Sequence, residues 1–124
     1  MMGQLGEALQ KSQGKKIVAI SLENDQLRIQ FKGHALIVQE SEAVCCESRY
    51  MVCDDKLENF IGATLIDLTI ENVPAVAEDA CGYEHEVEFM HVKTSKGSFT
   101  VSNHNQHNGN YGGFSIRATV ENIF

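Results

Sequence analysis

Short segments of alternating apolar and polar residues, separated by turn-forming pairs, constrain the fold of this chain most strongly. KKIVAISLEN and QLRIQF meet at Asn24-Asp25, and HALIVQ follows the Lys32-Gly33 pair. Alternation places successive side chains on opposite faces of a strand, and Asn, Asp and Gly tolerate the backbone of tight turns. This region therefore predicts a three-stranded antiparallel meander.

The alternating pattern continues in the second half of the chain. EHEVEFMHVKTS and SFTVSN flank the Lys96-Gly97 pair and predict a β-hairpin, and FSIRATVENI predicts a last strand. ATLIDLTIENV predicts a further strand. Its alternation assigns Ile66, Leu68 and Ile70 to one face and Leu65, Asp67 and Thr69 to the other.

Two short helices complete the predicted elements. Residues 3–13 carry apolar side chains at helical spacing before Gly14, and Asp54 or Asp55 could cap a helix that runs through Phe60 to Gly62. These elements predict a mainly β (α+β) fold in a single domain, residues 1–124. We expect one antiparallel sheet of six to seven strands that could close towards a barrel, with one or two short helices.

Composition narrows the classes of partner. Seventeen acidic against ten basic residues argue against binding of long DNA or RNA, which requires clustered Lys and Arg. The chain has neither an apolar run of roughly 20 residues nor the apolar centre of a signal peptide, so we expect a cytoplasmic protein that does not enter a membrane. A chain of 124 residues leaves much surface unburied, which favours a homo-oligomer.

The four cysteines are not expected to form a disulfide framework, since a reducing compartment is expected. Cys45 or Cys46 could serve as a nucleophile beside a histidine, although a packing role suits cysteine better. The four are Cys45, Cys46, Cys53 and Cys81.

Polar side chains are densest between Asn103 and Phe114, which we predict to be a loop between two strands. A tight turn needs one or two such residues, so the excess favours a binding role over a plain hairpin turn. Its glycines allow a ligand to approach the backbone closely, and its amides and imidazoles are neutral donors and acceptors. The candidate ligand-binding residues here are Asn103, His104, Asn105, His107, Asn108 and Tyr111.

Other chemistry is possible for the same residues. His104 and His107 could bind a metal together with a cysteine or an aspartate from elsewhere, as in a metal-dependent hydrolase or phosphodiesterase. An HNH-type nuclease is rejected, because that motif requires a helix where FSIRATVENI predicts a strand. We assign no catalytic residue, no metal and no cofactor.

Arginines and aromatic residues outside the loop could complete a nucleotide site. In the last strand Arg117 lies on the face opposite Ile116 and Ala118, three residues after the loop, where its planar fork could bind a phosphate. Arg49 is a second candidate. Phe89 and Phe99 could stack on a base.

Two blocks of sequence carry a family resemblance. The segment around Cys45-Cys46-Glu47 and the segment TSKGSF…HNQHNGNYGGF resemble a family of small phage and prophage proteins, mostly domains of unknown function, over roughly residues 15 to 121. The family is similar to, or includes, the phage inhibitor called Thoeris anti-defence one. Such proteins act as sponges that bind cyclic ADP-ribose isomers without cleaving them, and some hold cyclic oligonucleotides.

The resemblance implies a homo-oligomer, from a dimer to a hexamer, in the host-cell cytoplasm. It also implies that Arg117, Asn103 and either Phe89 or Phe99 contact the nucleotide. We therefore expect a non-enzymatic anti-defence protein that sequesters a cyclic nucleotide immune signal. The alternatives are the metal-dependent hydrolase and a protein–protein interaction module that blocks a host factor.

Overall fold

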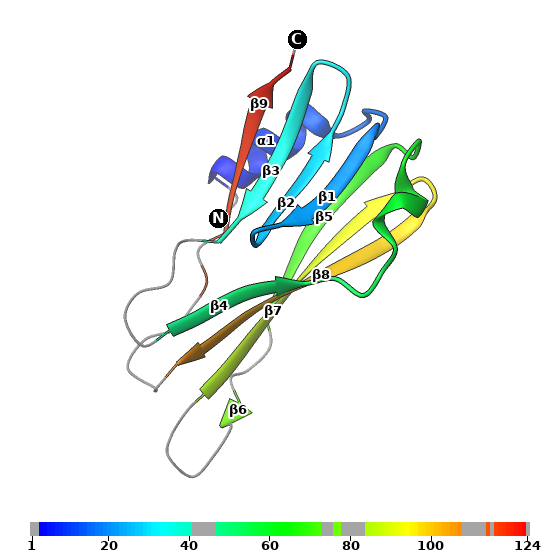
Figure 1. Ribbon diagram of the computed structural model, residues 1–124. Helices are drawn as coiled ribbons and strands as arrows, with labels where there is room; N and C mark the ends of the chain where they lie inside the picture. Colours follow the sequence, from blue (N-terminus) through cyan, green and yellow to red (C-terminus); the bar gives the residue numbers. More distant parts are fainter. Residues whose placement is uncertain are drawn as a thin grey trace.

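The strands form two antiparallel sheets that pack face to face (Figure 1). The computed structural model describes residues 3–40, 47–72, 76–77, 84–107, 114 and 116–123. The first sheet has the order β1 (Ala19–Glu23), β2 (Gln26–Gln30), β3 (His34–Gln39), β9 (Arg117–Asn122). The second has the order β4 (Glu47–Val52), β8 (Gly97–His107), β7 (Glu84–Thr94), β5 (Leu65–Asn72), and β6 (Val76–Ala77) also pairs with β7.

The prediction of a single, barrel-like sheet is wrong, because each sheet has its own apolar face and the two faces cover each other. One core cluster joins Leu36 and Val38 of the first sheet to Val92 and Phe99 of the second. Two packed sheets exclude water from both apolar faces, which a single open sheet of this composition cannot do. The described strands do not close into a barrel.

The predicted meander is confirmed. β1, β2 and β3 pair in succession, and Asn24 and Asp25 have φ values of 53° and 56°, the left-handed backbone that a two-residue hairpin turn requires. The Asp25 carboxylate accepts a hydrogen bond from the Met51 backbone N–H at 3.0 Å. This contact joins the turn of the first sheet to β4, a strand that the sequence pattern did not predict.

The predicted N-terminal helix is present as α1 (Gly3–Ser12). It buries Ala8 and Leu9 in the common core and lies against β9. The second predicted helix is only a 3₁₀ turn, η1 (Leu57–Phe60), and the predicted aspartate cap is wrong. Asp55 instead accepts a hydrogen bond from the Thr100 backbone N–H at 3.0 Å, beyond the point where β4 stops pairing with β8.

β5 is present, and its predicted division into two faces holds from Asp67 onward, where Leu68 and Ile70 share the core-facing side, but it is wrong for Leu65 and Ile66. The register against β7 shifts between Leu65 and Asp67, so one extra residue is inserted at this point. Leu65 and Leu68 are therefore both buried, whereas Ile66 is 42% exposed. A bulge of this kind resets which residues face the core.

β7 and β8 form a long hairpin that positions the candidate site. Thr94 pairs with Gly97 across the two-residue turn Ser95-Lys96, one residue before the predicted Lys96-Gly97 turn, and pairing continues to Glu84 and His107. The segment from Asn103 to His107 is therefore strand, not loop as predicted, because β7 and β4 pair with it on both sides. In Figure 1 this half of the hairpin extends with β4 beyond the first sheet.

None of the helices in the described part of the chain is long and apolar enough to cross a membrane.

Candidate functional site

One face of β8 changes from apolar to polar along its length while staying buried. Phe99 and Val101 are followed on the same face by Asn103, Asn105 and His107, and all five are at most 3% exposed. Buried polar side chains require hydrogen-bond partners, since an unpaired polar group inside a protein is costly. The polar half of this face is therefore the natural place to look for a binding site.

Charged residues from three other strands or strand ends meet this polar half. The register places Glu88 opposite Asn103, Glu86 opposite Asn105, and Arg49 opposite Asn105 on the other side. Together these residues and Glu40 form what we call the inner polar cluster, which consists of Glu40, Arg49, Glu86, Glu88, Asn103, Asn105 and His107.

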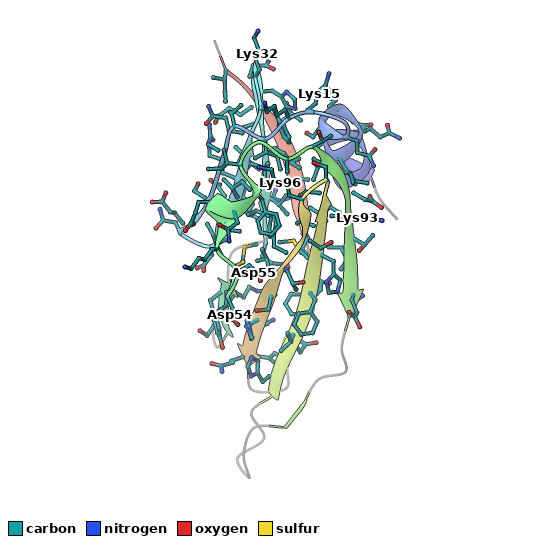
Figure 2. All side chains as sticks on the ribbon, turned by 90° about the vertical axis from the view of Figure 1, so that its right-hand side faces the viewer. Lys15, Lys32, Asp54, Asp55, Lys93 and Lys96 are labelled. Atoms are coloured by element: carbon teal, nitrogen blue, oxygen red, sulfur yellow. The ribbon has the colours of Figure 1, made fainter. Side chains whose placement is uncertain are left out.

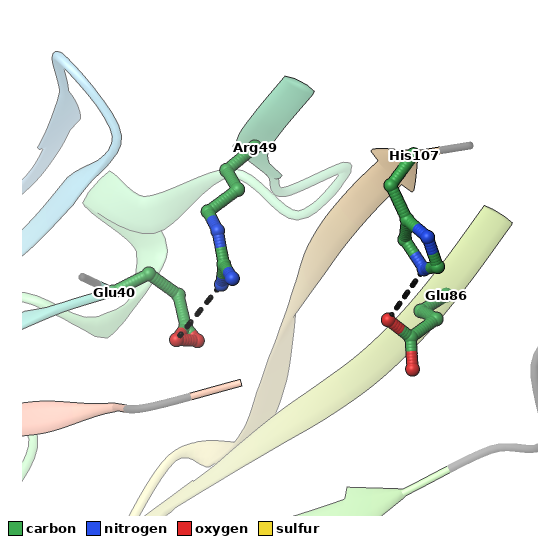
Figure 3. A network of polar contacts seen from close by, with 4 residues as sticks. All are labelled: Glu40, Arg49, Glu86 and His107. Atoms are coloured by element: carbon green, nitrogen blue, oxygen red, sulfur yellow. Dashed lines mark hydrogen bonds and ion pairs between the residues drawn. The ribbon is translucent and has the colours of Figure 1, made fainter. Parts of the chain in front are cut away.

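An ion pair and a hydrogen bond organise part of the inner polar cluster (Figure 3). Arg49 Nη1 lies 3.9 Å from Glu40 Oε1, and the side chains are 12% and 9% exposed. His107 Nε2 lies 2.9 Å from Glu86 Oε1, with the His107 side chain 3% exposed. Such burial makes the Arg49–Glu40 pair far less accessible to screening by salt than a surface pair.

Glu88 and Asn103 carry three of the four buried side-chain atoms that lack a hydrogen-bond partner among the described residues, and Asn105 Oδ1, in a residue that makes other contacts, is the fourth. Glu88 is 6% exposed and Asn103 is fully buried, yet Glu88 Oε1 and both amide atoms of Asn103 have no hydrogen-bond partner among the described residues. Unpartnered buried donors and acceptors are few in folded proteins and are frequent at functional sites. These atoms therefore have hydrogen bonds left to complete.

The environment of Glu88 favours its neutral form. Burial, followed by the negative charge of Glu40, raises the pKa of the Glu88 carboxyl to about 7. The Asn103 amide across the strand pair partly opposes this rise in pKa, although the two side chains do not meet hydrogen-bond geometry. A carboxyl group in this range can act as a donor as well as an acceptor near neutral pH.

The opposite, outer face of β8 carries a separate group of rings. The Tyr50 and His104 rings stack with centroids 4.7 Å apart, and His85 Nε2 lies 2.7 Å from His104 Nδ1. Ser102 Oγ donates to the Val52 carbonyl, so it accepts from His104 Nε2 and leaves His104 Nδ1 to accept from His85. Burial, followed by the His85 charge, lowers the pKa of His104.

A pocket of about 340 Å³ opens beside these rings, on the outer face. Phe89 and the hydroxyls of Thr100 and Ser102 line it, and Asp54 and Asp55 provide carboxylates at its edge. Because the pocket and the inner polar cluster lie on opposite faces of the same hairpin, one small ligand cannot contact both.

The structure separates the residues that the sequence predicted to form one site. Asn103, Asn105, His107 and Arg49 lie together on the inner face, whereas His104 and Phe89 lie on the outer face and Phe99 is 1% exposed in the core. Alternation along a strand is the reason. The predicted positions Asn108 and Tyr111 lie outside the described residues.

Arg117 is not brought to the inner polar cluster. It is exposed on β9 opposite Gln39, on the face of the first sheet that also carries Arg28 and Glu121. Arg28 Nη2 and Glu121 Oε1 form an ion pair at 2.6 Å on this face. Glu40 is the next residue after Gln39 and contacts Arg49, so it points to the other side of the sheet.

The structure gives no support to metal binding by His104 and His107. Residues three apart on a strand point to opposite faces, so these two rings cannot share one ion. Within the described ranges, no group of three or more His, Cys, Asp or Glu residues could hold a metal. Cys53 is a half-buried free thiol packed on the core, and Cys45, Cys46 and Cys81 lie outside the described residues.

Glu40, Glu86 and Glu88 were not predicted as site residues, although the sequence contained enough information to place Glu86 and Glu88. A two-residue turn at Ser95-Lys96 fixes the hairpin register, and counting outward from it pairs Glu88 with Asn103. Once the turn is placed at Ser95-Lys96, the sequence therefore predicts that Glu86 and Glu88 face Asn105 and Asn103 on the next strand. The position of Glu40 depends on how the two sheets pack and has no such signal.

Fold and site together define a two-sheet antiparallel β protein with a buried polar cluster at one end of a long hairpin. A family model described as "Domain of unknown function (DUF7448)" matches residues 10–117, so the chain belongs to this family. No curated protein and no solved structure matches the chain. The family description assigns no function, and the relation to phage anti-defence proteins stays a prediction.

Proposed function

We propose that this chain captures a small polar ligand, a cyclic nucleotide of the ADP-ribose class, in the inner polar cluster and holds it without converting it. The observation that carries the proposal is the buried, unpartnered pair of Glu88 and Asn103. A ligand that supplied partners to these atoms would gain hydrogen bonds in a site from which water is already largely excluded.

The chemistry of the cluster supports binding of a nucleotide. Asn103 and Asn105 offer amides, which suit the edge of a base or the hydroxyls of a ribose. Arg49 provides a planar fork that suits a phosphate. Neutral amides bind a ligand but transfer no proton at neutral pH, which favours capture over turnover.

A second function is supported by one contact. The Glu86 carboxylate holds His107 at 2.9 Å, and an imidazole oriented by a carboxylate is a common general base. A hydrolase without a metal ion is therefore the alternative. It predicts a chemically altered ligand.

The test is to mix the protein with cyclic ADP-ribose isomers and with cyclic oligonucleotides, measure binding by calorimetry, and then denature the complex. Mass spectrometry of the released ligand separates the two functions. Intact ligand at one equivalent per site supports capture, and conversion with turnover supports the hydrolase. If none of these nucleotides binds, the proposed function is wrong.

Two variants locate the site. Asn103→Leu should weaken binding at least tenfold, because it removes a donor and an acceptor from the inner face. Arg117→Ala, on the exposed face of the first sheet, should leave the affinity within about twofold. The reverse result would move the ligand to the outer face of the first sheet.

A further inference from the structure

The charges of the inner polar cluster raise a difficulty for any anionic ligand. Glu40, Glu86 and Glu88 supply three carboxyl groups, whereas the basic side chains that contact them among the described residues are the Arg49 guanidinium and the His107 imidazole. Figure 2 shows Lys15, Lys32, Lys93 and Lys96 towards the end of the molecule that holds the β7–β8 turn. Because the cluster occupies the opposite end of the hairpin, these lysines cannot compensate its charge.

Glu88 is the carboxyl group best placed to lose its charge. Glu40 lies against the Arg49 guanidinium, and Glu86 lies against the His107 imidazole. Glu88 makes no such contact with a basic side chain of the described residues, is 6% exposed, and has a buried oxygen without a hydrogen-bond partner among them.

Resting on the proposed function, we propose that Glu88 is the residue that selects the ligand. It binds as a neutral carboxylic acid, donates its O–H to an acceptor atom of an anionic nucleotide, and takes up a proton from solvent on binding in each molecule whose free Glu88 is charged. The class of ligand is thus an anion that presents a hydrogen-bond acceptor to Glu88 and an edge with one donor and one acceptor to Asn103.

The groups around Glu88 couple its protonation to the binding of an anion. The neighbouring charged or titratable groups are Glu40 after β3, Arg49 on β4, Glu86 on the same strand and His107 on β8. An anionic ligand among them adds negative charge, which raises the pKa of Glu88 above its ligand-free value of about 7. Proton uptake on binding follows from that difference in pKa.

The experiment is isothermal titration calorimetry of the full chain with cyclic ADP-ribose, in two buffers of different ionisation enthalpy, at about pH 6, 7 and 8. Wild type should take up a fraction of a proton that grows from pH 6 to 8, and its affinity should fall by up to about tenfold per pH unit above pH 7. Glu88→Gln, which is neutral at every pH, should show no uptake and an affinity independent of pH.

A matched control and a ligand-free measurement complete the test. Glu58→Gln, on the exposed 3₁₀ turn, should behave as wild type. Binding without proton uptake, or uptake that survives in Glu88→Gln, would overturn the inference and leave the proposed function standing. Failure of every nucleotide to bind would overturn the proposed function and this inference with it. Carbon-13 NMR of the free protein gives an independent check, because a Glu88 carboxyl fully charged at pH 6 contradicts the inference.

Discussion

The two halves of the β7–β8 hairpin have the same backbone pairing but opposite chemistry on their buried face. Near the turn, Val92 pairs with Phe99 and both side chains lie in the core shared by the two sheets. Further from the turn, Glu88 pairs with Asn103, and neither side chain has its hydrogen bonds completed within the described chain. Pairing and burial are therefore shared by the two halves, and only the side chains differ.

The apolar half of the hairpin contributes to stability, and the polar half contributes to the proposed function. The apolar half stabilises the fold by removing Phe99 and its neighbours from water. The polar half does not add to the free energy of unfolding in this way, because a desolvated amide or carboxyl group without a partner lowers it. A buried face of this kind is expected where a binding function has been maintained at some cost in stability.

The largest expected effect is in the apolar half. Phe99→Ala should lower the free energy of unfolding by about 3–5 kcal/mol, because it leaves a cavity where the ring packs against Phe60 and the core. Urea denaturation followed by circular dichroism measures the change. Phe89→Ala, on the half-buried outer face of β7, is the matched control, and an equal loss there would contradict the division of the hairpin.

The next effect is the pH dependence contributed by Glu88. Its folded pKa of about 7 lies above the ordinary value of 4.5, so the unfolded chain releases this proton first as pH rises. The free energy of unfolding should therefore fall between about pH 4.5 and 7, by on the order of 3 kcal/mol in total.

Glu88→Gln should remove this contribution, and the measurement is the difference between the unfolding curves of the variant and of wild type at each pH. The difference is needed because His34 and His104 have lowered pKa values, which reduce stability as pH falls below 6.5. If the two curves run parallel from pH 4.5 to 7, Glu88 is charged throughout that range.

The smallest expected effect tests the polar half directly. Asn103→Leu keeps the volume of the side chain and removes an amide without partners, so the free energy of unfolding should stay constant or rise by about 1 kcal/mol. Val101→Asn, two residues away on the same face, should instead destabilise the protein. A clear loss of stability in Asn103→Leu would mean that its amide is hydrogen-bonded, for example by internal water.

Part of the site could be predicted from the sequence, because pairing within a hairpin depends on residues that are close together in the chain. The alternation of EHEVEFMHVKTS and SFTVSN located both strands, and three of the predicted binding residues, Asn103, Asn105 and His107, lie together on the inner face. The error was to treat the polar residues as a loop. Asn is unusual in strands, and here the pairing of β8 on both sides overrides that preference.

The amino-acid sequence by itself determined the β character, the meander, the long hairpin and α1, because these depend on side-chain period and on backbone preferences within a few residues. Only the tertiary structure decided that there are two sheets and that β4 borders β8. It also divided the candidate residues between two faces and brought Arg49 and Glu40 into the inner polar cluster. These outcomes depend on which apolar faces cover each other, and that is settled by contacts between residues far apart in the chain.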